Sequence, residues 1–582
     1  MSLNGMRPAV RPSWSLLMSI TLVLVCSGLS LAEDYYRNRS LGRHLMSLAE
    51  RNPELVRVES IARSINRRNV WLVEVGRGAR QNHETRPAML VVAGVEGNDL
   101  IGCSAAVSWV NHLAEQYGND ADVTKLLDTT TIYVMPRLNP DAAGHFFTKP
   151  KFETSLNKRP VDDDHDGLID EDGPEDINGD GLVTWMRIED PEGEYILDPG
   201  DNRLLLKADH LKGEVGAWRY LTEGTDNDKD ERWNEDGPGG VNFNRNFPHD
   251  FKFFGANAGL HPVSEAETRA IADFVIEHPN IGIVMTYGDA DNLSKTPKGA
   301  RPAGRRKPMT AIDEGDVGYY RAMGDIYREA LGLDKELEGA AASGSFSDWM
   351  YYHRGRLSLA ARAWSPAVAG EMSKPAEKEE EQNSESDKKR KDRGDGDRRN
   401  ERQRRQLKWF DENAPKAFVK WRAVEHPDFP NQRVEVGGYA PFALTNPPAS
   451  MVEQITAKHA NFLTTAAKKL PRIGIREVKT RHLGRSVYEV RIEVENTGFL
   501  PTSLAQGRTT REVFPTRLLV DLEDRYFLSG ARFTPLPAIR GSGGMVEARY
   551  TIQAPDRRKI GFEVVSTLAG RVGGAIELPD AK

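Results

Sequence analysis

Two short segments of the 582-residue sequence carry oxygen-bearing side chains at the spacing of a calcium-binding loop. In such a loop the ligands stand at positions 1, 3, 5 and 9, and a glycine at position 6 makes the sharp turn. Ten acidic residues and no lysine or arginine lie between 162 and 180, and they repel one another unless a cation neutralises them. We therefore expect Ca²⁺ here, with these candidate ligands: Asp162, Asp164, Asp166 and Asp170 in the first loop, and Asp176, Asn178, Asp180 and Thr184 in the second.

The alternative interpretation of these loops is a solvated acidic surface segment. Neither loop has a clear bidentate glutamate at position 12, and no helices obviously flank them, so paired EF-hands are not predicted. A third run, Asp226, Asp228 and Asp230, has Glu231 where the glycine is wanted and is the weakest candidate.

Four other segments form a recognisable series along the chain: Asn139-Pro140-Asp141, NRNFP at 244–248, SEAETR at 264–269 and GSFSDWMYY at 344–352. Together they resemble the M14 zinc carboxypeptidase family over roughly residues 35–470. Within that family, the chain looks like a bacterial subgroup with a calcium-loop-like insert and a C-terminal β domain. The resemblance implies a sheet between helices, a zinc ion held by an H-x-x-E loop and a second histidine, and a glutamate as general base.

The positions that the resemblance assigns to zinc and to the base hold other residues. Glu96 and Asp99 stand where the histidine and glutamate of the H-x-x-E loop belong, and Met285 stands where the second histidine belongs. The expected general base falls on Arg362. Carboxylates can still offer oxygen to a metal, but the thioether of methionine is a soft ligand that suits other metals.

Arginine cannot accept a proton at neutral pH, so Arg362 is not a general base. We expect it to pair instead with Glu96 or Asp99. Glu435 is the remaining, weak candidate for a base. Zinc, which the family uses, is doubtful on these substitutions, and no catalytic residue is assigned.

The substrate-binding pair of the family is retained. Asn244 and Arg245 match the residues that, by the resemblance, hold the terminal carboxylate of a peptide. Peptide or protein C-termini are therefore the predicted partners. The formal charge of −7 argues against broad nucleic-acid binding, which needs a basic surface.

Alternating apolar strands and amphipathic helices predict an α/β fold with a mixed, mostly parallel sheet between helices. After residue 471 short alternating strands between Gly, Pro and Asn predict an antiparallel β-sandwich. The expected strands are 70–75, 88–95, 131–136, 281–287, 487–495, 518–522, 545–552 and 560–565, and the expected helices are 105–117, 264–276 with a serine cap, and 451–470.

The chain begins with the pattern of a secretory signal: Arg7 and Arg11, an apolar run, then small residues before Glu33. We expect export, to the periplasm, the cell surface or the medium, with no membrane contact after cleavage. The expected division is a signal peptide 1–32, a carboxypeptidase-like domain 33–372 with an Asp-rich insert 160–240, a disordered charged insert 373–408, the end of that domain 409–472, and a β-sandwich 473–582.

Three functions are compatible with these features. The first is an exported, catalytically inactive carboxypeptidase-like protein that still binds peptide C-termini. The second is an active carboxypeptidase with non-standard metal ligands such as Glu96 and Asp99. The third is a calcium-dependent structural or surface-binding protein. The oligomeric state and the partner are left open by the sequence.

Overall fold

The computed structural model describes residues 35–78, 85–163, 167–300, 309–333, 343–372, 395–554 and 557–579. The expected signal peptide 1–32 therefore lies outside the described residues, as do residues 373–394 of the charged insert and the candidate ligands Asp164 and Asp166.

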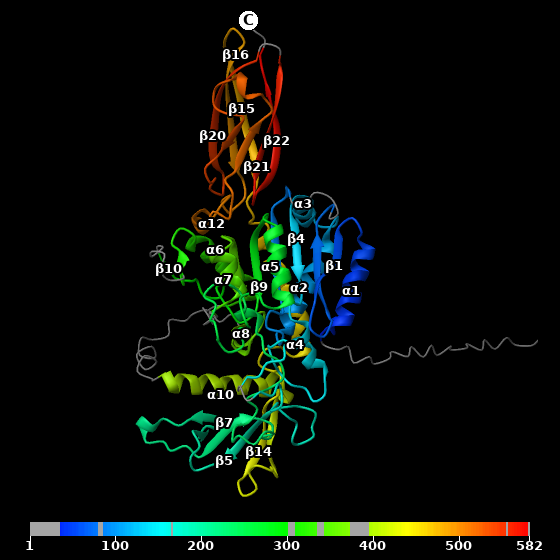
Figure 1. Cartoon of the computed structure of the whole chain (residues 1–582), viewed down its shortest axis with the longest axis vertical. Helices are drawn as coiled ribbons and strands as arrows, with labels where there is room; N and C mark the ends of the chain where they lie inside the picture. Colours follow the sequence, from blue (N-terminus) through cyan, green and yellow to red (C-terminus); the bar gives the residue numbers. More distant parts are fainter. Residues whose placement is uncertain are drawn as a thin grey trace, which may run out of the picture. The chain divides into compact units, whose positions relative to one another are not determined.

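The central sheet has six strands, and helices cover both of its faces (Figure 1). Strands β3, β4, β9 and β12 are parallel, whereas β1 and β2 form the antiparallel edge. The parallel strands are buried along their whole length, which explains their nearly continuous apolar sequences. The prediction of a mixed, mostly parallel sheet is confirmed. In spatial order the strands are β1 (Val56–Arg63), β2 (Asn69–Val75), β4 (Thr131–Met135), β3 (Ala88–Val92), β9 (Ile281–Tyr287) and β12 (Leu357–Ala361).

One face of this sheet packs against α1, α2, α6 and α11, and the other against α5 and α7. Side chains alternate between the two cores, so that Met285 and Tyr287 of β9 join the first and Val284 joins the second. Helix α5 begins at Ala266, and its N-cap residue Glu265 makes no side-chain capping hydrogen bond, so the expected serine cap at Ser264 is wrong. The helices are α1 (Asn38–Arg51), α2 (Leu100–Gln116), α3 (Ala121–Thr129), α4 (Pro140–Gly144), α5 (Ala266–Glu277), α6 (Val317–Leu331), α7 (Phe346–Tyr352), α8 (Pro366–Met372) and α11 (Ala449–Ala467).

The Asp-rich insert contributes to a second, antiparallel sheet that the sequence analysis does not anticipate. Strand β14, from the segment expected to end the carboxypeptidase-like domain, pairs with the insert strand β5 instead of the central sheet, and β13 pairs with the other edge of β14. Val434 and Val436 of β14 pack against Met186 and Ile188 of β5, which gives the pairing an apolar core. The order is β13 (Phe418–Val424), β14 (Val434–Tyr439), β5 (Trp185–Glu189), β8 (Trp218–Thr222), β6 (Tyr195–Asp198) and β7 (Asp201–Lys207).

Helix α10 (Asp395–Asn413) corrects the prediction that residues 373–408 are disordered throughout. Its C-terminal half carries Leu407 and Phe410, which are both buried. Arg404 forms an ion pair with Asp198 of the second sheet. Despite its charged composition, this stretch therefore forms a helix, which is stabilised by an ion pair with an acidic residue and by a short apolar face.

Residues 473–577 form two four-stranded antiparallel sheets around one apolar core, which confirms the predicted β-sandwich. Strand β16 alternates as expected, with Val490, Ile492 and Val494 inward. One sheet is β15 (Ile473–Gly484), β16 (Val487–Asn496), β20 (Gly544–Gln553) and β18 (Phe527–Ser529); the other is β19 (Phe533–Pro535), β17 (Arg517–Val520), β21 (Lys559–Ser566) and β22 (Gly570–Glu577). Short elements elsewhere are β10 (Gly299–Ala300), β11 (Ile312–Asp313), α12 (Ala505–Thr510) and single 3₁₀ turns at His145–Phe147, His210–Lys212, Phe243–Arg245, Pro415–Ala417 and Asp524–Tyr526.

Candidate functional site

The loop after β3 carries the two carboxylates that stand at the expected zinc-ligand positions. Asp99 is the N-cap of α2, because its Oδ1 accepts a hydrogen bond from the Gly102 amide at 2.9 Å. The Asn446 side chain completes this cap by accepting from the amides of Leu100 and Ile101, at 2.8 and 3.0 Å. Burial raises the pKa of Asp99 to about 6, although the Gly102 amide opposes the shift. Asp99 therefore has a structural role in starting the helix.

Glu96 is buried, with 3% of its surface exposed, and it is held by a side chain from a distant segment. Asn244 donates its Nδ2 to Oε1 of Glu96 at 2.6 Å. Oε2 of Glu96 is shielded from water and accepts no hydrogen bond from any residue that the structure describes. Burial, and then the nearby Asp289 carboxylate, raise the pKa of Glu96 to about 8. A neutral, protonated Glu96 is therefore the favoured form at pH 7.

Gly288, just after β9, is the residue whose backbone lies against Glu96. A Cβ atom built on Gly288 would overlap Oε2 of Glu96. Met285 lies three residues earlier, within the strand, where it pairs with Val91 and Leu359 and is fully buried in the first core. The structure thus places a glycine backbone beside the Glu96 carboxyl, and it places Met285 among apolar side chains.

Arg362 follows β12 and forms an ion pair with Asp289, at 2.9 Å between Nη2 and Oδ1. Both side chains are about half exposed. Within the described part of the chain, the ion pair of Arg362 is with Asp289 and not with Glu96 or Asp99, although Arg362 still acts electrostatically on Asp99 and lowers its pKa. The physical reason is that Glu96 is too deeply buried and favours its neutral form, whereas Asp289 is open to solvent.

These residues do not fit a zinc ion. A catalytic zinc needs three nitrogen, oxygen or sulfur ligands around one open position. Glu96 and Asp99 each have one unpartnered oxygen, but among the described residues no group of carboxylates, thiols and histidines that could hold a metal includes either of them. The groups that meet this criterion lie in the Asp-rich segment. No step of zinc chemistry can be derived for this site.

Asn244 and Arg245 have separate roles. Asn244 is fully committed to the fold, since its amide nitrogen binds Glu96 and its Oδ1 accepts from the Phe346 amide at 3.1 Å. Arg245 is exposed and donates one hydrogen bond, from Nη1 to the carbonyl of Ala256 at 3.1 Å. Its guanidinium makes no other hydrogen bond to the residues that the structure describes, which leaves donors for a ligand. Of the retained pair, Arg245 is thus the residue that can meet a carboxylate.

Glu435 is placed on β14 and is not brought to Glu96. It binds Arg187 on the neighbouring strand β5 at 2.6 Å and Arg433, the residue just before β14, also at 2.6 Å. Burial raises the pKa of Glu435, but the hydrogen bonds from the two arginines outweigh it and keep the pKa below its ordinary value. Glu435 is a structural anion in the second sheet, which leaves it unsuited to act as a base.

In the described part of the first two predicted calcium loops, the candidate ligands make hydrogen bonds within the protein. In the second loop, Asp176 accepts from the amides of Asp180 and Gly181, and Asn178 also accepts from Asp180. Thr184 donates both its amide and its hydroxyl to Glu223. In the first loop, Asp162 accepts from the Gly167 amide and Asp170 accepts from the Gly239 amide.

Among the described residues, carboxylates converge in the third run and beside it. Oxygens of Asp226, Asp228 and Asp230 come within 4.8 Å of one another, and so do oxygens of Asp172, Asp228 and Glu235. Burial, and then the Asp172 carboxylate, raise the pKa of Glu235 to about 7. The sequence signal for this group was the alternation of the third run. The contributions of Asp172 and Glu235 depend on long-range folding and were missed.

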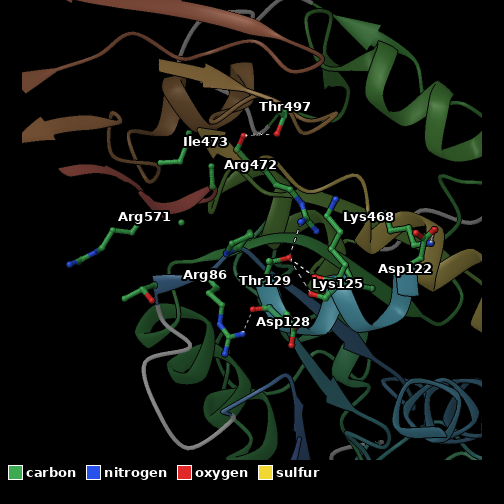
Figure 2. Close-up of a pocket in the computed structure, with 15 residues that line it drawn as sticks. Arg86, Asp122, Lys125, Asp128, Thr129, Lys468, Arg472, Ile473, Thr497 and Arg571 are labelled. Atoms are coloured by element: carbon green, nitrogen blue, oxygen red, sulfur yellow. Dashed lines mark hydrogen bonds and ion pairs between the residues drawn. The ribbon is translucent and has the colours of Figure 1, made fainter. Parts of the chain in front are cut away.

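A pocket of about 750 Å³ lies between α3, the end of α11 and the β-sandwich (Figure 2). Arg86, Lys125 and Arg472 line it with Lys468, which pairs with Asp122 at 2.8 Å. This mixed-charge pocket was not anticipated from the sequence, since its residues come from five separate segments of the chain. Among the helices that the structure describes, none is both long and apolar enough to cross a membrane.

Comparison with known proteins defines the class of the α/β part. Residues 42–163 match the family model described as zinc carboxypeptidase, which confirms the resemblance; the bacterial subgroup stays a prediction. Residues 472–577 match a family model described as a domain of unknown function. Residues 42–163 are thus similar to zinc carboxypeptidases, and the sandwich is similar to this second family.

Particular relatives agree with this class over a limited length. Carboxypeptidase M of Mus musculus is 28% identical over 107 residues, covering 18% of this chain and 24% of the relative. Carboxypeptidase B of Homo sapiens is 29% identical over 120 residues, covering 21% of this chain and 28% of the relative. The match therefore spans about a quarter of these relatives.

Solved structures of the same class are similar at low identity. Thrombin activatable fibrinolysis inhibitor has 15% identity and a TM-score of 0.36, covering 56% of this chain and 66% of that one. Carboxypeptidase A of Helicoverpa armigera has 14% identity and a TM-score of 0.35, covering 56% and 63%.

Proposed function

We propose that this chain is a catalytically inactive carboxypeptidase-like protein that binds the carboxyl ends of peptides without cleaving them. The observation that carries the proposal is the hydrogen bond from Asn244 to the buried Glu96. Glu96 stands at the position of the first expected metal ligand, and its carboxyl group favours the neutral form, which is a poor metal ligand. An active enzyme with non-standard ligands is disfavoured, because Arg362 and Glu435 are both unsuited to act as a base.

Arg245 supplies the binding chemistry. An exposed guanidinium with unoccupied donors can hold a carboxylate through two parallel hydrogen bonds. Asn244 cannot assist, since its amide is already bound to Glu96. We therefore expect weaker binding than in a site where both residues face the ligand, and selectivity for a free terminal carboxylate.

Calorimetry with a short peptide in two forms tests this proposal. The free acid should bind, and the C-terminally amidated peptide should bind at least about tenfold more weakly, because one charge-assisted contact is lost. Arg245→Gln should remove the difference. Arg269→Gln is the matched control, since Arg269 is also exposed and also donates to a backbone carbonyl. Equal affinity for acid and amide would overturn the proposal.

A second role, calcium-dependent stabilisation of the Asp-rich insert, is favoured by the convergent oxygens of the third run. We propose that Ca²⁺ binds there, with Asp226, Asp228 and Asp230 as ligands and Asp172 and Glu235 at its side. Oxygen-only ligand sets suit this cation, and neutralisation would relieve the repulsion between the carboxylates. The first two loops are retained as further candidates for calcium.

We also propose that the protein is exported. The support is the N-terminal sequence, with Arg7 and Arg11 before an apolar run and small residues before Glu33. Mass spectrometry of the protein from its native host should give a chain that starts at Glu33. A chain that keeps Arg7 would contradict cleavage.

A further inference from the structure

A cavity of about 540 Å³ lies where α1, the turn before β2 and the segment after β4 meet. We call it the arginine pocket, because arginine is its dominant lining residue and neither aspartate nor glutamate lines it. The whole chain is acidic, with a formal charge of −7, so this concentration of positive charge runs against its composition. The arginines of the pocket are Arg37, Arg39, Arg43, Arg67, Arg68 and Arg137.

Arg137 forms the buried part of the arginine pocket. It is 2% exposed, it has no ion pair among the residues that the structure describes, and its Nη2 is shielded without a hydrogen-bond acceptor. Its neighbour Cys103 offers no counter-charge, because burial raises the pKa of that thiol and keeps it neutral. Burying a charge without a partner is costly, so an anionic ligand is the natural complement.

Trp71 supplies a second donor that lacks an acceptor. Its indole Nε1 is shielded and makes no hydrogen bond within the described part of the chain, and the residue is 9% exposed. Two buried donors, one from Arg137 and one from Trp71, therefore line one cavity. A buried donor without a partner is uncommon in folded proteins and indicates an absent acceptor.

The rim of the arginine pocket consists of exposed arginines. Arg39, Arg43 and Arg67 have no ion pair among the described residues, and nothing in the cavity wall offsets their charge. Arg68 is half-buried, donates to the carbonyl of Pro140 at 2.8 Å and lies 3.8 Å from Asp141. Like charges that line one cavity repel one another, and an anion among them would relieve that repulsion.

Two glycines shape the arginine pocket before any ligand arrives. A Cβ on Gly144 would overlap the guanidinium of Arg68, and one on Gly42 would overlap the indole of Trp71. Both side chains are thereby held against backbone, which reduces the entropy lost when they bind a ligand. The pocket is therefore largely formed in advance.

We propose that the arginine pocket binds a small ligand that carries at least two phosphate or sulfate groups. Guanidinium groups match such oxyanions through paired hydrogen bonds, and several arginines need more than one negative charge. The volume suits a small molecule. The pocket of Figure 2 differs, since Asp122 and Asp128 line it and offset its cations.

Calorimetry with inorganic pyrophosphate on the purified full chain tests this inference, in buffer free of other phosphate or sulfate and at about 0.1 M ionic strength. Pyrophosphate should bind once per chain. The double variant Arg39→Gln with Arg43→Gln should weaken binding about a hundredfold, because each charge-assisted contact contributes about tenfold. Both side chains are exposed, so the fold should tolerate the change.

A control variant removes the same charge elsewhere. The control is the double variant Arg51→Gln with Lys125→Gln. Arg51 is on the same helix but outside the arginine pocket, and Lys125 lines the pocket of Figure 2. This control should change the affinity for pyrophosphate by less than about twofold. A sulfated disaccharide distinguishes a sulfate ligand from a phosphate ligand. If it binds more tightly than pyrophosphate, the ligand is a sulfate ester; if it binds more weakly, the ligand is a phosphate. Absence of pyrophosphate and disaccharide binding, equal binding of citrate, or an equal loss in the control would overturn the inference.

Discussion

The side-chain nitrogen Nδ2 of Asn244 lies 2.6 Å from Oε1 of Glu96, although the two residues are 148 positions apart in the chain. This contact joins the segment that was expected to bind substrate to the position that was expected to bind zinc. Both side chains are buried, so the contact belongs to the core of the molecule. A buried carboxyl group thus stands where the resemblance predicts a zinc ion with an open coordination position.

The pH dependence of stability follows from Glu96. Its pKa rises from 4.5 to about 8 on folding, so between those values the folded state binds more protons than the unfolded state. Stability should therefore fall as the pH rises through this window. Glu96→Gln keeps the acceptor for Asn244 and removes the titration. Thermal melts should show the variant more stable than the parent at pH 8 and similar to it at pH 4. Glu277→Gln, on an exposed side chain, should leave the pH profile unchanged.

Gly288 should be intolerant of a larger residue. A methyl group there would overlap Oε2 of Glu96, and the Glu96 side chain cannot move freely because Asn244 holds its other oxygen. Gly288→Ala should lower the free energy of unfolding by about 2 kcal/mol in denaturant titrations. Combining it with Glu96→Ala should cost less than the two single changes added together. Additive effects would show that the two positions are not in contact.

The ion pair between Arg187 and Glu435 should be important for the second sheet. Both side chains are buried, so Glu435→Gln leaves an uncompensated guanidinium and should destabilise the chain by about 3 kcal/mol. Because the pKa of Glu435 is lowered, its contribution is present at neutral pH and disappears as the pH falls below that pKa. Glu425→Gln, an exposed neighbour, should have little effect. A neutral outcome for Glu435→Gln would contradict the structural role.

Calcium at millimolar concentration should raise the melting temperature by a few degrees. The double variant Asp226→Asn with Asp228→Asn should abolish the rise, because it removes two of the convergent carboxylates. If Asp176→Asn with Asp180→Asn removes the rise instead, the second loop is the site. Asp524→Asn, an exposed acid of the sandwich, should have no effect. No shift in the parent protein would refute calcium binding.

Sequence reasoning found the elements that local pattern determines. The runs at β3 and β9 are apolar enough to be recognised as buried strands, and β16 alternates clearly. Sequence reasoning missed the elements whose interaction partners are distant in the sequence. The pairing of β14 with β5 depends on residues about 250 positions apart, and α10 depends on acids such as Asp198 that offset its arginines.

The candidate site shows the same limit. The motif positions identified Glu96, Asp99 and Arg362 as substituted, but the true partners were visible only after folding: Asn244 for Glu96 and Asp289 for Arg362. The arginine pocket had no sequence signal, since its arginines are scattered from Arg37 to Arg137 and form no motif.

Metal content measured together with peptide hydrolysis tests the central claim most directly. Purified protein, loaded with zinc and then dialysed, should retain well below one zinc per chain. It should release no C-terminal residue from a panel of peptides, with or without a chelator. One zinc per chain together with hydrolysis that the chelator abolishes would contradict the account.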